Sequence, residues 1–254
     1  ESRSPAEYMK LLKTRVPIRF GSALYSKLSR KKKYWEMAHV IGHPLVFAVA
    51  DFHEDQSMTW TSPALIEYLY GVTHDFAFDA EGKLIVRPLE ITTHEYQGKT
   101  IQSAFFFQKD AENVSAILFS STGTVAKFMR MGMLAGFGYE NQRMFRYGIK
   151  HRHDPNEIFP DYFSHEVKPG GVSEGWAEGL SMFHSPRARH PVNPSMFPGI
   201  AHHWFEGGQI VSLLPEFHVY SSMTMNIVNS GDQDAGLCAP PRGPSGGRVP
   251  QPKN

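Results

Sequence analysis

A carboxylate and an imidazole stand two residues apart at the end of the most apolar segment of the chain. Asp51 and His53 follow residues 45–50, all of which are apolar. Alternate residues of a β-strand face the same side, so the two side chains would project together. Carboxylate oxygens and imidazole nitrogens are ligands for Mg²⁺, Mn²⁺ and Zn²⁺. The spacing predicts Asp51 and His53 as metal ligands and catalytic groups; the alternative is an aspartate that caps the next loop beside a half-exposed histidine.

Histidine is the strongest compositional signal, with 13 in 254 residues. His151 and His153 resemble the His-x-His pairs of binuclear metal hydrolases, but the Asp-Pro-Asn sequence that follows them is typical of a turn. His202, His203 and His218 are weaker candidates, because histidines scattered over loops are more often structural donors than metal ligands.

The sequence contains the letters of a nuclease motif. Pro160-Asp161 followed by Glu166-x-Lys168 matches the catalytic pattern of restriction-endonuclease-like nucleases, in which the two acids lie on adjacent strands and hold Mg²⁺. Here the segment between the acids is too short for two strands and a turn. We therefore expect no nuclease site at these residues.

Basic side chains offer two candidate contacts for the phosphates of DNA or RNA. One is the run Lys31, Lys32 and Lys33, and the other is Lys127 with Arg130. The net charge is only +1, from 26 basic and 25 acidic residues, so no global field favours nucleic acid and only local clusters could bind it. The alternative for the lysine run is a solvated helix end.

Residues 120–124, rich in Ser, Thr and Gly, separate a candidate strand from a candidate helix. Backbone N–H groups in such a loop can bind phosphate. The loop lacks the lysine of a P-loop, so the alternative is an ordinary strand-to-helix turn.

The elements that position these groups form a repeated pattern of buried strand followed by helix. Residues 45–52 read as a central strand covered on both faces, and a helix with a serine cap follows from Ser62 to Gly71. A second apolar strand, 114–120, precedes a helix over 125–134. Open α/β sheets bind ligands at the carboxyl ends of their strands. The fold class predicted is α/β, with α+β as the alternative: a mixed central sheet with flanking helices, then a loop-rich region rich in His and Pro.

The remaining segments predict one domain over residues 1–228, with its core at about 17–148 and a loop-rich extension at about 149–228. A capping box at Ser4 starts a helix over 5–15, Pro17 ends it, and Ser22 caps a second helix. Turn residues predict hairpins around 79–82, within 91–101 and at 207–208, and a strand is expected at 143–147. Residues 151–198 read as mostly loop, and 229–254 as a disordered tail.

Other features limit the class of protein. A single cysteine, Cys238, makes no internal disulfide and fits a reducing, cytoplasmic location. No apolar stretch reaches the ~18 residues of a membrane span. The first residues contain neither an initiating methionine nor an apolar leader, which suggests a piece of a longer protein.

The chain resembles an uncharacterised bacterial protein family over residues 5 to about 225. The segments that carry the resemblance are 20–28, 43–53, 62–71, 111–132, 183–192 and 197–222. Longer members of that family contain an upstream segment similar to a PD-(D/E)xK nuclease half-site, after which this chain starts. The resemblance implies a nuclease-like core, and it transfers no catalytic residue to this chain.

Three hypotheses about function follow, in this order. The first is a fragment of a nuclease-like, nucleic-acid-processing protein that contacts DNA or RNA through the basic residues named above. The second is a hydrolase that uses Asp51, His53, further histidines and a divalent metal, either Mg²⁺, Mn²⁺ or Zn²⁺. The third is a non-catalytic module whose aromatic-rich surface binds another protein.

Overall fold

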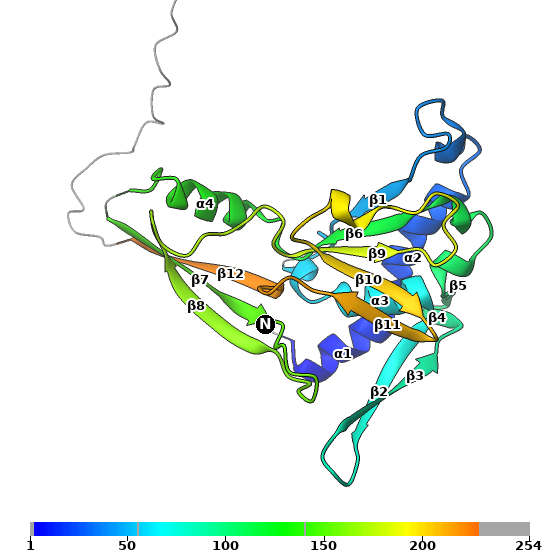
Figure 1. Ribbon diagram of the computed structural model, residues 1–254, viewed down its shortest axis with the longest axis horizontal. Helices are drawn as coiled ribbons and strands as arrows, with labels where there is room; N and C mark the ends of the chain where they lie inside the picture. The colour runs from blue at the N-terminus through cyan, green and yellow to red at the C-terminus, as the bar shows by residue number, and fades with distance from the viewer. Residues whose placement is uncertain (1–2, 55, 140, 229–254) are drawn as a thin grey trace, which may run out of the picture.

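A computed structural model describes residues 3–54, 56–139 and 141–228 of the chain (Figure 1). The tail expected at 229–254 lies outside the described residues. The helices are α1 (Pro5–Lys13), α2 (Arg15–Leu28), α3 (Ser62–Tyr70) and α4 (Val125–Leu134). They accompany a five-stranded sheet, a three-stranded sheet and two separate hairpins.

The five-stranded sheet is mixed and confirms the predicted α/β class. Its strands lie in the order β1-β6-β9-β10-β11; the pairs β1/β6 and β9/β10 are parallel and the other two are antiparallel. The strands are β1 (Val46–Val49), β6 (Ala116–Ser120), β9 (Leu180–His184), β10 (Ala201–Glu206) and β11 (Gln209–Leu213). Residues expected to form an extension therefore supply three strands of the main sheet.

The first apolar strand occupies a different position from the one expected. β1 lies at the edge of the sheet and is mostly half-buried, so the prediction of a central strand was wrong. The interior position next to it belongs to β6, whose Ala116, Ile117 and Phe119 are almost fully buried. Both strands read as apolar runs, and only the pairing partners distinguish them.

The N-terminal helices begin and end for recognisable reasons. Ser4 and Glu7 form the expected capping box at the start of α1. Pro17 does not end a helix; it lies in the first turn of α2, where a missing N–H costs no hydrogen bond. Ser22 is likewise not a cap but an interior residue of α2, whose hydroxyl donates to the carbonyl of Ile18. Helix α3 starts at Ser62, so the prediction of a serine cap was wrong: Ser62 is the first helical residue, and Thr61 holds the N-cap position without a side-chain hydrogen bond. The helix ends at Tyr70 and is followed by Gly71 in a left-handed conformation, with φ of 72°.

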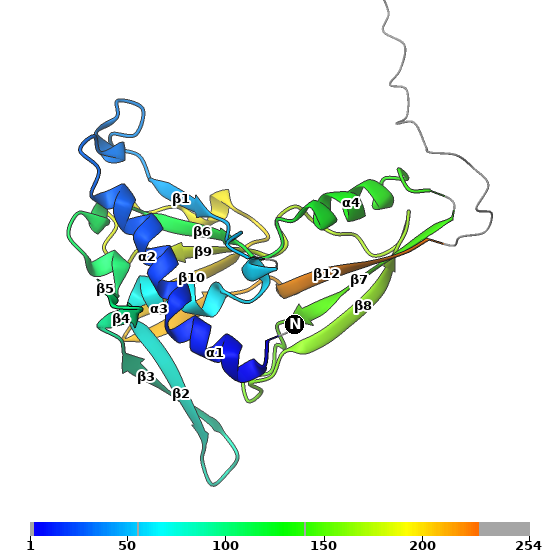
Figure 2. The same ribbon diagram turned by 180° about the vertical axis from the view of Figure 1, so that it is seen from behind.

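Helices α2 and α3 pack against one face of the main sheet (Figure 2). Leu24, Leu65, Leu69, Phe105 and Phe119 belong to the large apolar core between them. The hydroxyl of Tyr70, the last residue of α3, lies 3.0 Å from the carbonyl oxygens of both His184 and His203. This hydroxyl therefore ties the end of α3 to two neighbouring strands.

The three-stranded sheet forms a second lobe beside the first. Its antiparallel strands lie in the order β12-β7-β8 and comprise β7 (Gln142–Lys150), β8 (Asp161–Val167) and β12 (Val219–Val228). Helix α4 covers one of its faces (Figure 1). The expected strand at 143–147 is thus the centre of a larger sheet. Residues 151–198 are mostly loop, as expected, but they contain β8 and β9.

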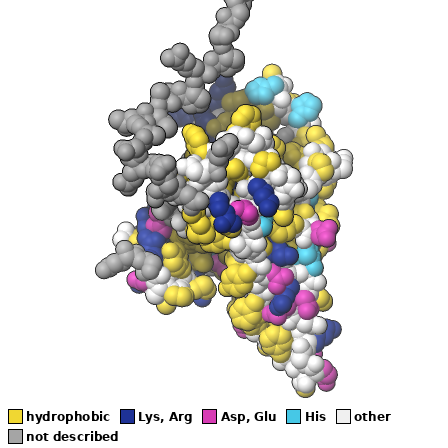
Figure 3. Space-filling view, turned by 90° about the vertical axis from the view of Figure 1, so that its left-hand side faces the viewer, with side chains coloured by type: hydrophobic (Ala, Val, Ile, Leu, Met, Phe, Trp, Pro, Cys, Tyr) yellow, Lys and Arg dark blue, Asp and Glu magenta, His cyan; other side chains and the backbone are white. Residues whose placement is uncertain are grey.

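Two hairpins complete the fold, and both were predicted from their turn residues. They are β2 (Val72–Phe78) with β3 (Leu84–Glu90), and β4 (Thr93–Tyr96) with β5 (Lys99–Gln102). The β2–β3 hairpin projects from the body, and Figure 3 shows hydrophobic side chains on this part of the molecule. Phe76 and Phe78 are about half exposed there.

Candidate functional site

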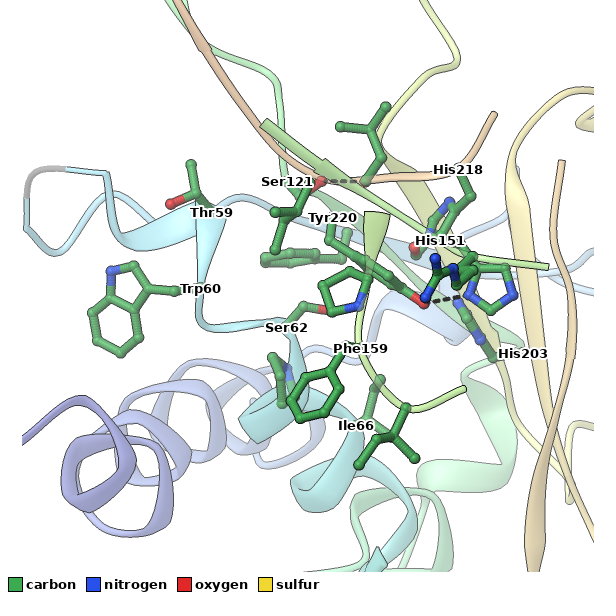
Figure 4. Close-up of a pocket in the computed structure, with 18 of the residues that line it drawn as sticks. Thr59, Trp60, Ser62, Ile66, Ser121, His151, Phe159, His203, His218 and Tyr220 are labelled. Carbon is green, nitrogen blue, oxygen red and sulfur yellow. Dashed lines mark hydrogen bonds between the residues drawn. The ribbon is translucent and has the colours of Figure 1, made fainter. Parts of the chain in front are cut away.

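A pocket of about 520 Å³ lies where the two lobes meet (Figure 4). Its walls come from the start of α3, the carboxyl end of β6, the ends of β7 and β10, the start of β12 and the loop after β7. The residues that line it include Trp60, Ser62, Pro63, Ile66, Phe119, Ser121, Ile149, His151, Arg152, Glu157, Phe159, His203, His218 and Tyr220. The pocket thus uses the carboxyl end of a β6–α4 unit, although from a different strand than expected.

One end of the pocket is polar because three histidines and a tyrosine meet there (Figure 4). Nδ1 of His151 lies 2.8 Å from the hydroxyl of Tyr220, and the rings of His203 and His218 are 6.5 Å apart. Nδ1 of His203 lies 2.8 Å from the hydroxyl of Ser212 on the neighbouring strand. The loop after β7 and the segment 203–220 therefore bring their polar groups to one place.

The histidines at this end stay neutral at physiological pH. Burial, with a smaller contribution from neighbouring histidines, lowers the pKa of His203 to about 3 and that of His218 to about 4. Burial also lowers the pKa of His151, with a smaller contribution from His153. A neutral imidazole carries one donor and one acceptor, so this end of the pocket offers hydrogen bonds without net charge.

One of these groups lacks a hydrogen bond. His218 is 4% exposed, and its Nδ1 atom has no hydrogen-bond partner among the residues that the structure describes. An unpaired buried polar atom costs about 1–3 kcal/mol. Among the described residues that line the pocket, His218 is the one with a buried side-chain nitrogen left unpaired.

The other end is apolar and its mouth is electrically balanced. Trp60 lies on the side opposite the histidines, and Phe159 and Ile66 line the wall between (Figure 4). The cation at the mouth, Arg152, contacts Glu157 at 2.8 Å and Asp161 at 3.1 Å. The pocket therefore combines an apolar wall with neutral hydrogen-bonding groups.

Asp51 and His53, the predicted metal ligands, contact each other. Oδ1 of Asp51 lies 2.7 Å from Nδ1 of His53, and the histidine side chain is 1% exposed. Nε2 of His53 lies 3.8 Å from Glu54, which in turn pairs with Arg3. Asp51 also borders a second hollow, which is lined by the segment after β1, the start of α4 and β12. In the described part of the chain, no group of three or more His, Cys, Asp or Glu side chains could hold a metal ion, so these geometries do not support the metal site.

The predicted phosphate contacts at Lys127 and Arg130 are not on the surface. These side chains are 4% and 0% exposed and face the three-stranded sheet. Nζ of Lys127 donates to the carbonyls of Trp176 and Glu178, and Arg130 makes a two-pronged contact with Glu174 at 2.6 and 2.7 Å. Both cations serve the interior of the second lobe, where they have no access to a polyanion.

The lysine run has a different environment. Lys31 and Lys32 are exposed, whereas Lys33 contacts the carbonyl of Leu28 and lies 3.4 Å from Asp110. These residues follow α2 and are remote in sequence from the elements of the histidine pocket. The structure therefore leaves two of the five predicted nucleic-acid contacts free in solvent.

The remaining motifs have structural roles. Asp161 and Glu166 lie on the same strand, β8, and pair with Arg152 and Arg143, so they do not form the paired-strand arrangement of a nuclease. In residues 120–124, Thr124 caps α4 by accepting from the N–H of Lys127. This favours the ordinary strand-to-helix turn.

Sequence reasoning named three of the pocket histidines only as weak candidates and missed Tyr220. A signal was present: His218 directly precedes β12 and Tyr220 is its second residue, and alternate residues of an extended chain face the same side. What the sequence could not supply was the antiparallel pairing of β12 with β7, which brings His151 beside them.

Comparisons with family models, with curated proteins and with solved structures found no match. In the described residues, no helix is long and apolar enough to cross a bilayer. The resemblance to a bacterial family with a nuclease-like segment therefore stays a prediction from the sequence.

Proposed function

We propose that this protein binds a small, uncharged organic molecule with an apolar body and one hydrogen-bonding head group. The observation that carries the proposal is His218, whose buried Nδ1 has no partner within the described chain although it belongs to a pocket lining. A volume of about 520 Å³ lies within the ~300–1,000 Å³ common for small-molecule sites.

Charge complementarity favours a neutral ligand. The histidines are held uncharged by burial, and the only cation of the lining is matched by two carboxylates. A carboxylate or phosphate would lose water and find no free cation in exchange. An ammonium group would meet neutral rings rather than an unpaired acid.

Shape and polarity favour a molecule with two unlike ends. The head group, such as a hydroxyl or an amide, would contact His218 and Tyr220. The body would lie against Trp60, Ile66 and Phe159, where burial of apolar surface supplies most of the affinity.

Four probes with one aromatic body test this proposal: benzyl alcohol, toluene, benzoate and benzylamine. Binding is measured by ligand-observed NMR and by the shift in thermal unfolding temperature. We expect dissociation constants of ~0.1–10 mM for the two neutral probes, as for any ligand with so few atoms, and weaker binding of both ions. Benzyl alcohol should bind better than toluene by ~3- to 10-fold, the effect of one hydrogen bond.

The matched variants are His218→Leu and His39→Leu. The first should abolish the preference for benzyl alcohol over toluene; the second replaces an exposed histidine and should leave it unchanged. Equal binding of all four probes, no binding of the neutral pair, or a preference that survives in H218L would contradict the proposal.

Nucleic-acid binding by a nuclease-like fragment is a second candidate, supported by the exposed Lys31 and Lys32 with neighbouring Lys33. Its test is duplex DNA binding at several salt concentrations. Contacts with two phosphates predict a slope of about −2 in log K against log salt, reduced by about 1 for each of Lys31 and Lys32 replaced by glutamine. Binding absent at low salt, or independent of salt, would exclude it.

A further inference from the structure

Helix α4 turns its apolar residues outward and its cations inward. Val125, Phe128 and Met129 are 76%, 59% and 47% exposed, whereas Lys127 and Arg130 of the same helix are buried. A surface helix of a globular protein ordinarily has the opposite arrangement. In Figure 1 the helix lies on the outer side of the second lobe, away from the main sheet.

The orientation of α4 is fixed by its buried face. Arg130 contacts Glu174 through two nitrogens and Thr224 through a third, at 2.5–2.7 Å. Lys127 donates to two backbone carbonyls of the segment that contains Glu174. Rotating the helix to bury its apolar residues would break these contacts and leave charges buried without partners, which is strongly unfavourable. The apolar face must therefore remain outward.

The outward face forms a continuous surface with a neighbouring loop. The ring of Trp176, which is 62% exposed, lies 5.3 Å from the ring of Phe128. Gly132 follows on the same helical face, one turn beyond Met129, and a Cβ atom placed there would meet nothing within 4 Å in the described structure. We refer to Val125, Phe128, Met129, Gly132 and Trp176 as the α4 patch.

The size of the α4 patch corresponds to that of a small interface. Aromatic side chains offer on the order of 150–250 Å² each, so the patch presents about 500 Å² at its observed exposures. Two such patches in contact would bury about 1,000 Å², the lower limit for a specific protein interface. The patch also reaches the size at which exposed apolar surface on a monomer commonly marks a binding site.

The absence of charge on the α4 patch favours a second copy of this chain as its binding partner. The described residues of the patch are all uncharged, so two copies can meet face to face without bringing like charges together. A two-fold contact places the same patch on both sides, and an uncharged apolar strip with a glycine is complementary to itself. Both cations of α4 are turned inward, so the helix offers no basic residue for an anionic lipid surface.

We infer that the α4 patch is the contact surface between two copies of this chain, with α4 packed against α4 about a two-fold axis. The small area predicts a weak, concentration-dependent dimer. The contact lies away from the histidine pocket and does not depend on the proposed ligand.

Sedimentation velocity over a hundredfold range of protein concentration tests this inference. The wild-type chain should shift from monomer to dimer as concentration rises. Phe128→Glu should weaken the dimer by about tenfold or more, because it places two carboxylates at a desolvated contact. Phe76→Glu, which replaces a half-exposed phenylalanine of the β2–β3 hairpin, should leave the dimer intact.

A mixing experiment excludes an effect of misfolding. F128E and F128K should each be monomeric when alone and should associate when mixed, with far-UV circular dichroism unchanged. A wild-type chain that stays monomeric at every concentration, or an F128E dimer as tight as the wild type, overturns the inference. Binding of the monomer to phosphatidylcholine vesicles would show a membrane contact instead and would equally overturn it.

Discussion

The two lobes have interiors of opposite character. The main lobe encloses Leu65, Leu69, Phe106 and Phe119 in a large apolar core. The second lobe has an apolar cluster built on only three buried residues, beside the charged side chains of Arg130, Arg146, Glu174 and Glu178. Apolar side chains can pack against one another in many orientations, whereas a buried ion pair is stable only with a particular partner in a particular geometry. The interior of the main lobe should therefore tolerate substitutions of similar volume, whereas the interior of the second lobe should depend on particular charged residues.

Arg146 shows how closely the charged interior is matched. Its guanidinium contacts Glu178 at 2.8 Å and Ser222 at 2.9 Å, and lies over the rings of Phe163 and Phe217. Its remaining nitrogen, Nη2, lies 3.4 Å from Glu174 without a hydrogen bond to any described residue. Removal of Glu174 would therefore leave Arg130 without its acid partner and Arg146 with Glu178 alone.

The largest effect is expected from Glu174→Ala. This change leaves Arg130 and Arg146 buried without their shared acid, at a cost of ~3–5 kcal/mol in the free energy of unfolding. Urea unfolding monitored by circular dichroism measures it. The matched control is Glu166→Ala, which breaks the exposed pair with Arg143 and should cost no more than ~1 kcal/mol. Similar losses in both variants would show that the charged interior has no special role.

Apolar replacement of the whole pair sharpens the same comparison. In the double variant Arg130→Met with Glu174→Leu, no charge of this pair remains uncompensated. We expect it to be at least ~2 kcal/mol more stable than E174A, since well-packed apolar residues often equal a buried ion pair. A double variant no more stable than E174A would indicate that these charges are needed for folding itself.

The main core should respond to volume rather than to polarity. Leu65→Ala removes a fully buried side chain and should cost ~2–5 kcal/mol, whereas Leu65→Met should cost less than ~1.5 kcal/mol. Thermal and urea unfolding of both variants provide the measurement. Equal losses would contradict the description of this core as tolerant of changes in shape.

Acid should destabilise the main sheet through its buried histidines. Burial lowers the pKa of His184 to about 4 and of His203 to about 3, below the unfolded value near 6.5. The unfolded chain therefore binds more protons between these values, and stability falls as pH drops from about 6.5 towards 4. Each histidine contributes up to ~1.4 kcal/mol per pH unit. Unfolding at pH 7, 6 and 5 should show a smaller slope in His203→Gln and an unchanged one in His39→Gln.

The smallest effect is expected at the surface of the main lobe. Ser4→Ala removes the side-chain cap of α1, a helix with no buried residue among those described. The cost should be ~1 kcal/mol, confined to that helix. Hydrogen exchange should speed up in α1 and stay constant in α2; faster exchange throughout would show that the two helices open together.

Local patterns predicted much of the local structure, although not the roles of Pro17, Ser22 and Ser62. The capping box at Ser4, the left-handed Gly71 and the hairpin turns each depend on a few adjacent residues, and the structure has them where expected. The pairing of strands depends on residues far apart in sequence. This is why β1 was placed at the centre of the sheet and is found at its edge.

The candidate site was harder to predict for the same reason. His151, His203 and His218 lie on three different segments, and no spacing rule connects them. Lys127 and Arg130 were interpreted as surface cations because charged residues seldom lie inside a protein. The acid partner of Arg130, Glu174, lies more than forty residues later in a glycine-rich loop. The carbonyls that accept from Lys127 lie in the same loop, and only the folded chain brings these groups together.

Tyr70 has a mechanical consequence for the pocket. Helix α3 begins at the pocket wall with Ser62 and ends at Tyr70. The hydroxyl of Tyr70 donates a hydrogen bond to the backbone carbonyl of His203 on β10. Helix α3 thus connects the apolar wall of the pocket to the strand at its polar end. A ligand would therefore enter a pocket whose width is set by this connection, so the selectivity of the pocket should depend on the length and thickness of the ligand as much as on its chemistry.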